Sequence, residues 1–291
     1  MKKEWREAAR SEARLQDRLR DCFADSIARL PAPLQRLAFG RFRRYMLWWI
    51  FRAYGREVTL APAGPAGNRF YMKLHPMAYS DFIVGIYEPG CVRVLREHVS
   101  EGSVCVDIGA NLGYLSILMS QLAGAEGQII AFEPMPDTLE LLRENVAING
   151  LRNIMIVAAA ASDVTGSADL LSEADENVAK TASMVGYRLE GPGRVTNVRS
   201  LRLDDYFSGS ARLPNVVKID VEGAETMVLR GARETIARSR PLLLVEVHAW
   251  ESSASRDVLQ LLSDFGYRTE IVELRPPEAL CLAKPLESPN A

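Results

Sequence analysis

The residues that form disulfides and bind transition metals are scarce in this sequence, which has only four cysteines and three histidines among 291 residues. None of Cys22, Cys91, Cys105 and Cys281 belongs to a C-x-x-C pair, which argues against a zinc knuckle. Cys105 lies inside an apolar strand pattern, so we expect a buried thiol and a reduced, cytoplasmic setting.

Long hydrophobic runs are also absent. No apolar stretch reaches the roughly 18 residues that a membrane-spanning helix needs. The first residues are highly charged and have no early apolar run with a small-residue cleavage site, so we expect no secretory signal. The length and the 48% hydrophobic content leave room for one large core and an appendage.

Charge is unevenly distributed along the chain. Residues 1–57 hold 14 Lys and Arg against 7 Asp and Glu, whereas residues 58–291 hold 21 against 30. The acidic body argues against nucleic acid as the main partner, and the basic arm could meet an anionic surface or the body itself.

Alternating strands and helices are predicted for most of the chain. After an N-terminal arm over residues 1–57, two short strands form a hairpin over 58–74, and a single domain follows over 75–291. Its expected strands are 104–106, 128–132, 154–159, 215–219, 242–247, 267–273 and 279–284, with shorter ones near 167–171 and 195–201. The expected helices are 112–123, 137–149, 224–238 and 255–265. Continuous apolar strands between helices indicate an α/β fold with a mostly parallel sheet covered on both faces.

The most informative segment is the turn after the first of these strands. Asp107 is followed by Gly109, Asn111 and Gly113, and then by a helix. Glycines let the backbone approach a ligand closely, and ligands of open α/β sheets bind beyond the C-terminal ends of the strands. Glu133 ends the next strand, 26 residues after Asp107, where its carboxylate can accept hydrogen bonds from two ribose hydroxyls.

The pattern of this turn also distinguishes between ligands. A dinucleotide site prefers G-x-G-x-x-G, whereas this turn reads D-x-G-x-N-x-G. The acid before the first glycine would repel a pyrophosphate. It suits a ligand with an ammonium and a sulfonium group, as in S-adenosylmethionine (SAM).

Several blocks together make the chain resemble the FkbM family of class I SAM-dependent methyltransferases, over roughly residues 80–250. The blocks are Tyr87–Pro89, Val106–Tyr114, Ala131–Pro134, Leu203–Asp205, Lys218–Glu225, Gly231–Ala232 and Val245–His248. The resemblance implies a Rossmann-like, seven-stranded sheet, SAM as methyl donor, and O-methylation of a small-molecule or glycan-type acceptor.

The resemblance also implies roles for single residues. Residues Asp107, Gly109, Asn111 and Gly113 should surround the methionine part of SAM, and Glu133 should bind the ribose while Pro134 shapes the turn.

The adenine side is less clear, because four alanines stand at 158–161 where many class I enzymes have an acid. Ser162 and Asp163 follow, and Asp163 could either reach the adenine or simply begin a turn.

Polar residues near the ends of the fourth and fifth expected strands are candidates for the chemistry. Residues two apart on a strand share a face, so Asp220 accompanies Lys218 and His248 accompanies Glu246. A hydroxyl acceptor needs its proton removed by a base or a metal. We expect His248 to be the general base or an acceptor contact, oriented by Asp220, Glu222 and Glu246.

Two other interpretations of these residues stay open. A magnesium or manganese ion could bind to Asp220, Glu246 and His248, because oxygen ligands with one imidazole suit these ions. Alternatively, Glu246 could form a structural ion pair with Lys218, and His248 could merely end its strand.

The expected reaction also has alternatives. DNA adenine methyltransferases carry an N/D-P-P-Y-type block after the fourth strand, and this chain has Asp220-Val221-Glu222-Gly223 there. That difference favours an oxygen acceptor. N- or carboxyl-methylation of a small acceptor remains an alternative, and so does a SAM-binding scaffold without catalysis.

The arm is predicted to form two helices, over 3–30 and 34–54, of which the second is rich in arginine and aromatic residues. Such a helix can pack on the enzyme body or on a second subunit, lie at a membrane surface, or close over the substrate.

Overall fold

The computed structural model describes residues 58–60, 72–74, 87–173, 182–184, 193–250 and 252–286. The arm over residues 1–57 lies outside them, so its two helices and its contacts with a membrane or a second subunit stay predictions. Within the described ranges, no helix has both the length and the apolar character that a bilayer span requires.

A short hairpin precedes the main domain in the sequence. Its strands are β1 (Val58–Leu60) and β2 (Met72–Leu74), which pair antiparallel with Val58 opposite Leu74. The two expected strands are therefore present. The hairpin belongs to a different compact unit from the sheet described next, so each is described by itself.

The main sheet has seven strands in the order β12-β13-β11-β10-β3-β4-β5. Their bounds are β3 (Val104–Ile108), β4 (Gln128–Phe132), β5 (Ile154–Val157), β10 (Val216–Ile219), β11 (Leu242–Val247), β12 (Tyr267–Arg275) and β13 (Glu278–Pro285). The five strands from β11 to β5 run parallel, and β12 and β13 form an antiparallel hairpin at one edge. The expected seven-stranded, mostly parallel sheet is confirmed.

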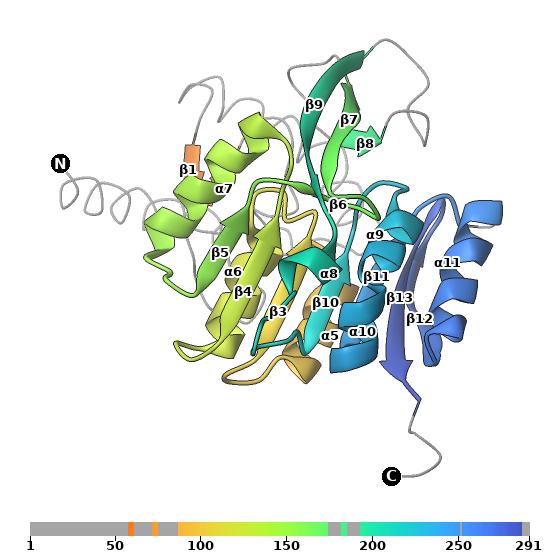
Figure 1. Cartoon of the computed structure of the whole chain (residues 1–291). Helices are drawn as coiled ribbons and strands as arrows, with labels where there is room; N and C mark the ends of the chain where they lie inside the picture. Colours follow the sequence, from red (N-terminus) through yellow and green to blue (C-terminus); the bar gives the residue numbers. More distant parts are fainter. Residues whose placement is uncertain are drawn as a thin grey trace, which may run out of the picture. The chain divides into compact units, whose positions relative to one another are not determined.

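Helices cover both faces of this sheet (Figure 1). They are α5 (Pro89–His98), α6 (Tyr114–Ala123), α7 (Pro136–Asn149), α8 (Leu203–Tyr206), α9 (Glu225–Gly231), α10 (Arg233–Ser239) and α11 (Ser253–Asp264). Because side chains alternate along a strand, Val106 and Ile108 face the core beneath α9 to α11, while Asp107 points to the opposite face, towards α6. This alternation decides which polar residues can meet.

A second, four-stranded sheet follows β5 in the sequence, and it contains the two short strands predicted near 167–171 and 195–201, which are β7 and β9. Its order is β6-β9-β7-β8, and its bounds are β6 (Ala160–Ala161), β7 (Gly166–Glu173), β8 (Ala182–Met184) and β9 (Gly193–Leu201). The predicted strand over 154–159 is therefore too long. The main-sheet strand ends at Val157, because Ala160 and Ala161 pair with β9 instead.

The predicted single helix over 224–238 is also wrong, since α9 and α10 are separated at Ala232. Gly231 lies directly before this break. A Cβ atom added to Gly231 would lie 1.9 Å from the carbonyl oxygen of Ser162, so the end of α9 rests directly on the backbone after β6. A glycine is required there because no side chain fits.

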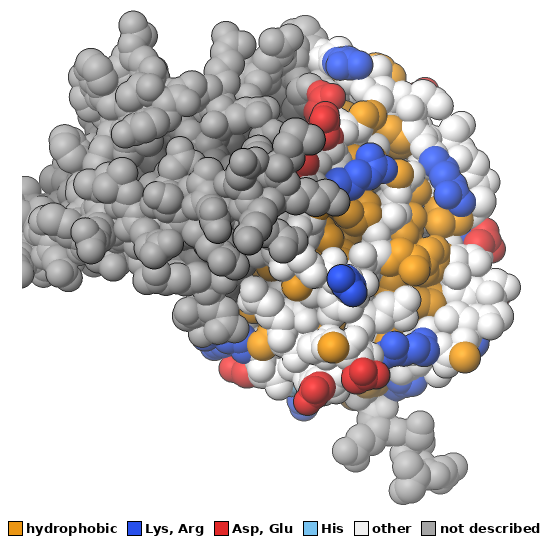
Figure 2. All heavy atoms as spheres, turned by 90° about the vertical axis from the view of Figure 1, so that its left-hand side faces the viewer, with side chains coloured by type: hydrophobic (Ala, Val, Ile, Leu, Met, Phe, Trp, Pro, Cys, Tyr) orange, Lys and Arg blue, Asp and Glu red, His pale blue; other side chains and the backbone are white. Residues whose placement is uncertain are grey.

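Strand β5 is an edge of the main sheet, and its Met155 is 48% exposed. On the side of the domain that carries β5 and α7, hydrophobic side chains lie at the surface between scattered Lys and Arg side chains (Figure 2). Exposed apolar side chains at an edge strand are therefore a feature of this face.

Replacing Gly231 with Ala should destabilise the domain by about 1–3 kcal/mol, because the added methyl group overlaps the Ser162 carbonyl and the backbone must move. The measurement is the free energy of unfolding in urea. The exposed neighbour Arg230 is the control, and its replacement with Ala should change stability by no more than about 0.5 kcal/mol. Equal, small effects of both changes would contradict the close approach.

Candidate active site

A pocket opens at the C-terminal ends of β3, β4 and β10. Four predicted cofactor residues line it, namely Gly109, Asn111, Glu133 and Pro134. Much of the remaining wall is apolar and includes Phe132, Met135, Leu170 and Val221 as well as the alanines 159–161. The pocket thus combines one acid from β4 with an apolar slot, at the edge of the sheet where open α/β folds bind ligands.

Glu133 is fixed by two backbone groups. The amides of Asn111 and Met135 donate to its two carboxylate oxygens, at 3.0 and 2.9 Å. Burial raises the pKa of Glu133 to about 7, although these hydrogen bonds and the charge of Lys218 act in the opposite direction. A carboxylate has about four acceptor positions, so Glu133 can still accept hydrogen bonds from a ligand.

The backbones of the turns after β3 and β10 approach each other very closely. A Cβ atom on Gly109 would lie 1.9 Å from the carbonyl oxygen of Asp220. Gly109 and Asn111 both have positive φ angles, of 79° and 51°. The glycine thus allows the β3 turn to lie against Asp220 and places both turns on one pocket wall.

Asp107 does not line the pocket. Its side chain is 1% exposed, accepts a 2.5 Å hydrogen bond from Ser116 Oγ and lies 3.4 Å from Lys218 Nζ. Asp107 lies within strand β3 and points to the face of the sheet, so it cannot project beyond the strand end. Its expected contact with the methionine part of SAM therefore stays a prediction without support from its position.

Lys218 connects the turns of β3 and β10. Its ammonium donates to the Gly109 carbonyl at 3.0 Å and to Asp220 at 3.2 Å, besides its contact with Asp107. Burial alone would lower the pKa of Lys218, but Asp220 and Asp107 outweigh burial and raise it well above its ordinary value. Lys218 is therefore a permanent cation beneath the pocket.

Three other predicted cofactor residues also lie off the pocket wall. Gly113 directly precedes α6, and a Cβ atom there would meet Leu142 at 2.5 Å. Ser162 is buried and its hydroxyl lies 3.3 Å from Asp163 Oδ1. The alanines 159–161 line the pocket in place of Ser162 and Asp163.

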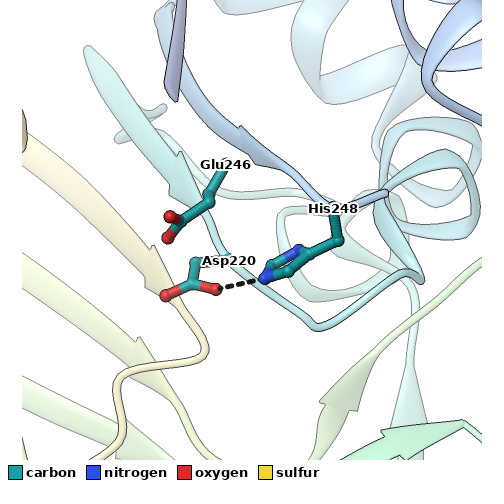
Figure 3. A group of neighbouring side chains, drawn as sticks. All are labelled: Asp220, Glu246 and His248. Atoms are coloured by element: carbon teal, nitrogen blue, oxygen red, sulfur yellow. Dashed lines mark ion pairs between the residues drawn. The ribbon is translucent and has the colours of Figure 1, made fainter. Parts of the chain in front are cut away.

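The four predicted catalytic residues come together beside the pocket. Asp220 and Glu222 line it, and His248 Nε2 lies 3.7 Å from Asp220 Oδ1 and 3.4 Å from Glu222 Oε2. Asp220, Glu246 and His248 converge from two neighbouring strand ends (Figure 3), with ligand atoms all within 4.8 Å of one another.

The imidazole of His248 contacts Glu225, the first residue of α9. Nδ1 of His248 lies 2.6 Å from Glu225 Oε1, and the His248 side chain is only 2% exposed. Burial alone would lower the pKa of His248, but the Glu225 hydrogen bond and the charges of Asp220 and Glu222 raise it to about 9. Nδ1 is thereby engaged, and Nε2 faces the carboxylates.

Glu246 is paired on its other side. Arg275 Nη2 lies 2.9 Å from Glu246 Oε1. Burial raises the pKa of Glu246 to about 8, with Asp220 and Glu88 adding to the effect and Arg275 opposing it. The alternative pairing of Glu246 with Lys218 is therefore wrong, because Arg275 takes that place and Lys218 contacts Asp107 and Asp220.

Three contacts of the predicted site residues were not predicted themselves. Glu225 belongs to a quoted block, and its place at the start of a helix two residues after Gly223 was the signal that could have identified it. Ser116 and Arg275 lie in a helix and at an edge strand, where no sequence pattern connects them to Asp107 or Glu246.

Residues 107–269 match the family described as the methyltransferase FkbM domain. A hexuronic acid methyltransferase of Haloferax volcanii is 31% identical over 197 residues, which cover 68% of this chain and 77% of the relative. A 2-O-methyltransferase of Sinorhizobium fredii is 30% identical over 55% of this chain and 72% of its own length. The crystal structure of an FkbM methyltransferase from Methylobacillus flagellatus gives a TM-score of 0.44 at 20% identity, over 63% of this chain and 44% of that one.

Replacing Lys218 with Met should destabilise the domain by about 3–5 kcal/mol, because Asp107 then remains buried without its cation. Urea unfolding measures the change, since urea does not screen charges. Replacing Asp107 with Leu in the same chain should restore at least about 1 kcal/mol. Additive losses in the double variant would argue against direct coupling of the two charges.

Proposed function

The chain belongs to the FkbM methyltransferase family, and on this premise we propose that it transfers the methyl group of SAM to a hydroxyl group of a sugar or other small acceptor. Residues lining the pocket would hold the donor, and the charged group at the ends of β10 and β11 would handle the acceptor. Asp220 carries the proposal, because it lines the pocket and also contacts His248.

The donor half of the pocket fits SAM in its chemistry. Glu133 offers free acceptor positions for ribose hydroxyls, and the apolar wall with Phe132, Leu170 and the alanines suits a flat adenine ring. The carboxylate of Asp220 lies on the β10 side and could attract the sulfonium and ammonium groups. Ser162 and Asp163 are not needed for this arrangement.

The acceptor half supplies what an uncharged hydroxyl requires. Methyl transfer is an in-line attack on the sulfonium methyl, so the enzyme aligns the acceptor oxygen and promotes loss of its proton. His248, oriented by Glu225, is the residue that we assign to this step. Because its pKa is raised to about 9, it accepts the proton in its deprotonated fraction, which grows as the pH rises towards 9. Asp220, Glu222 and Glu246 would orient it and bind polar groups of the acceptor.

The names of the relatives support a sugar-like acceptor, because one is a hexuronic acid methyltransferase and another a 2-O-methyltransferase. A hexuronic acid offers both hydroxyls and a carboxylate. Methylation of a carboxylate, which has no proton to remove, is therefore the second candidate function.

The pH dependence of SAM binding tests the role of Glu133. Ribose hydroxyls donate hydrogen bonds, so SAM should prefer the ionised carboxylate, whose pKa is about 7. Affinity should therefore fall as the pH drops below 7 and level off about 10-fold weaker once Glu133 is fully protonated. Calorimetry with SAM between pH 5.5 and 8.5 measures this.

A Glu133→Gln variant is the matched control for the SAM titration. It should bind SAM about 10-fold more weakly at pH 8 and show a flat pH profile in place of the slope. The assignment of Glu133 to the ribose would be wrong if the variant kept the slope of the unmodified chain.

Replacing His248 with Gln tests the acceptor half. The variant should bind SAM as tightly as the unmodified chain but transfer methyl groups at least about 100-fold more slowly, because the step that removes the proton is lost. The assay follows labelled methyl from SAM into uronic acids and neutral sugars. Mild alkali then separates a stable methyl ether from a labile ester.

Three results of this assay would count against the proposal. Unchanged turnover of the His248→Gln variant would remove His248 from the mechanism. An alkali-labile product would replace hydroxyl methylation by the carboxyl alternative. A chain that binds SAM but methylates none of these acceptors would favour a SAM-binding scaffold.

A further inference from the structure

Asp220, Glu246 and His248 form a compact set of potential metal ligands. The parallel register places Lys218 opposite Leu244. Two residues further along each strand, the same register brings Asp220 beside Glu246. His248 follows two residues later on the same side. The three side chains therefore point into a common space (Figure 3), with ligand atoms within 4.8 Å of one another.

The distances between these side chains fit ligation of a small divalent ion better than direct hydrogen bonds. His248 Nε2 lies 3.7 and 3.4 Å from Asp220 and Glu222, which is longer than an ordinary N–H···O hydrogen bond of about 2.9 Å. An ion with bonds of about 2.1 Å spans ligand atoms about 3.0 to 4.2 Å apart. The donor atoms of Asp220, Glu246 and His248 lie within 4.8 Å of one another, so a shift of less than about 1 Å brings the widest pair into this span.

The imidazole is also prepared for ligation. Nδ1 is engaged by Glu225 Oε1 at 2.6 Å, and the His248 side chain is 98% buried because only 2% of it is exposed. A carboxylate on one ring nitrogen keeps the proton there, so an ion that binds the other nitrogen displaces only the second proton of the imidazolium. Metal-binding histidines are typically held in this way. Nε2 is the atom that faces Asp220 and Glu222.

Carboxylates outnumber cations around this space. Glu222 and Glu225 flank His248, while Glu88 and Asp107 act on Lys218. With Asp220 and Glu246 these make six acids, against Lys218, Arg275 and one imidazole among the described residues. A divalent cation would neutralise the excess.

We propose that Asp220, Glu246 and His248 hold a divalent cation of the magnesium–manganese class, with Glu225 as the residue that positions the imidazole. Two carboxylates with one imidazole match the oxygen-rich ligand sets of these ions. Asp220 is reached from the pocket, so the ion can enter there and keep open positions for an acceptor.

The ion deepens the proposed function, and its catalytic role rests on that function. Bound there, the ion would polarise the acceptor hydroxyl and lower its pKa, so that the proton passes to water. His248 would then act as a ligand of the ion through Nε2, in place of accepting the proton itself. The oxygen then forms a bond to the methyl carbon while the carbon–sulfur bond breaks. The products are the methyl ether and neutral S-adenosylhomocysteine.

The test uses the full chain, stripped with a chelator and titrated with Mn²⁺ alone. Paramagnetic resonance follows the loss of the free Mn²⁺ signal, and calorimetry gives the stoichiometry. We expect one Mn²⁺ per chain, and binding at least about 10-fold weaker in each of Asp220→Asn, Glu246→Gln and His248→Gln. Glu225→Gln should weaken binding by about 10-fold without removing a ligand.

Glu270→Gln is the matched control, because Glu270 is an exposed carboxylate on β12 that pairs with Lys284, away from the proposed ligands. It should leave Mn²⁺ binding unchanged. Thermal unfolding of every variant shows that the fold is intact. Failure of the chain to bind Mn²⁺, or equal binding by all the variants, would overturn the site.

Failure of the metal site and failure of the proposed function give different results. Full methyl transfer in the presence of a chelator, with no Mn²⁺ binding, overturns the metal site and leaves the proposed function standing. Specific Mn²⁺ binding at the three residues without transfer to any hydroxyl supports the site and overturns its proposed role.

Discussion

The contact between Lys218 and Asp107 joins β10 and β3, the two neighbouring strands at which the order of the strands along the sheet reverses. From β3 the chain proceeds through β4 to β5 on one side, and it then returns to β10 and β11 on the other. Parallel sheets bind ligands at such a reversal. The Lys218 ammonium contacts Asp107 within β3, and also Asp220 and the Gly109 carbonyl in the turns beyond. Removing this cation would leave two buried or partly buried carboxylates facing each other across the reversal.

The residues that we propose for the donor were predictable because they follow strand ends closely. Gly109, Asn111 and Glu133 each come after a short apolar strand, and all three line the pocket. Asp107 was assigned to the same ligand because it belongs to the same sequence block. A residue within a strand points to one face of the sheet. Only residues that follow the strand can reach the pocket at the C-terminal ends of the strands. Val106 and Ile108, the apolar residues on either side of Asp107, already indicated that Asp107 points to the opposite face of the sheet.

The partners of the acceptor side were less predictable, because they come from distant segments. Glu225 reaches His248 from the start of a helix, and Arg275 reaches Glu246 from an edge strand. Neither contact follows from spacing along one element. In the four-stranded sheet β7 and β9 were predicted, but β6 was missed for a similar reason, since it has only two residues and pairs with β9 about 40 positions later. Short strands carry too few side chains to show a period.

Backbone strain supports an active enzyme over a passive binder. Five described non-glycine residues have positive φ angles, and Glu222, Ala249 and Glu88 among them belong to or adjoin the charged group. Such conformations cost of order 1 kcal/mol or more each. Burying charges adds to this cost, since Glu246 and His248 are only 7% and 4% exposed. A protein that merely bound SAM would need only the pocket wall at the end of β4 and the apolar slot beside it. The costly features lie instead at the ends of β10 and β11, where an acceptor would meet the methyl group.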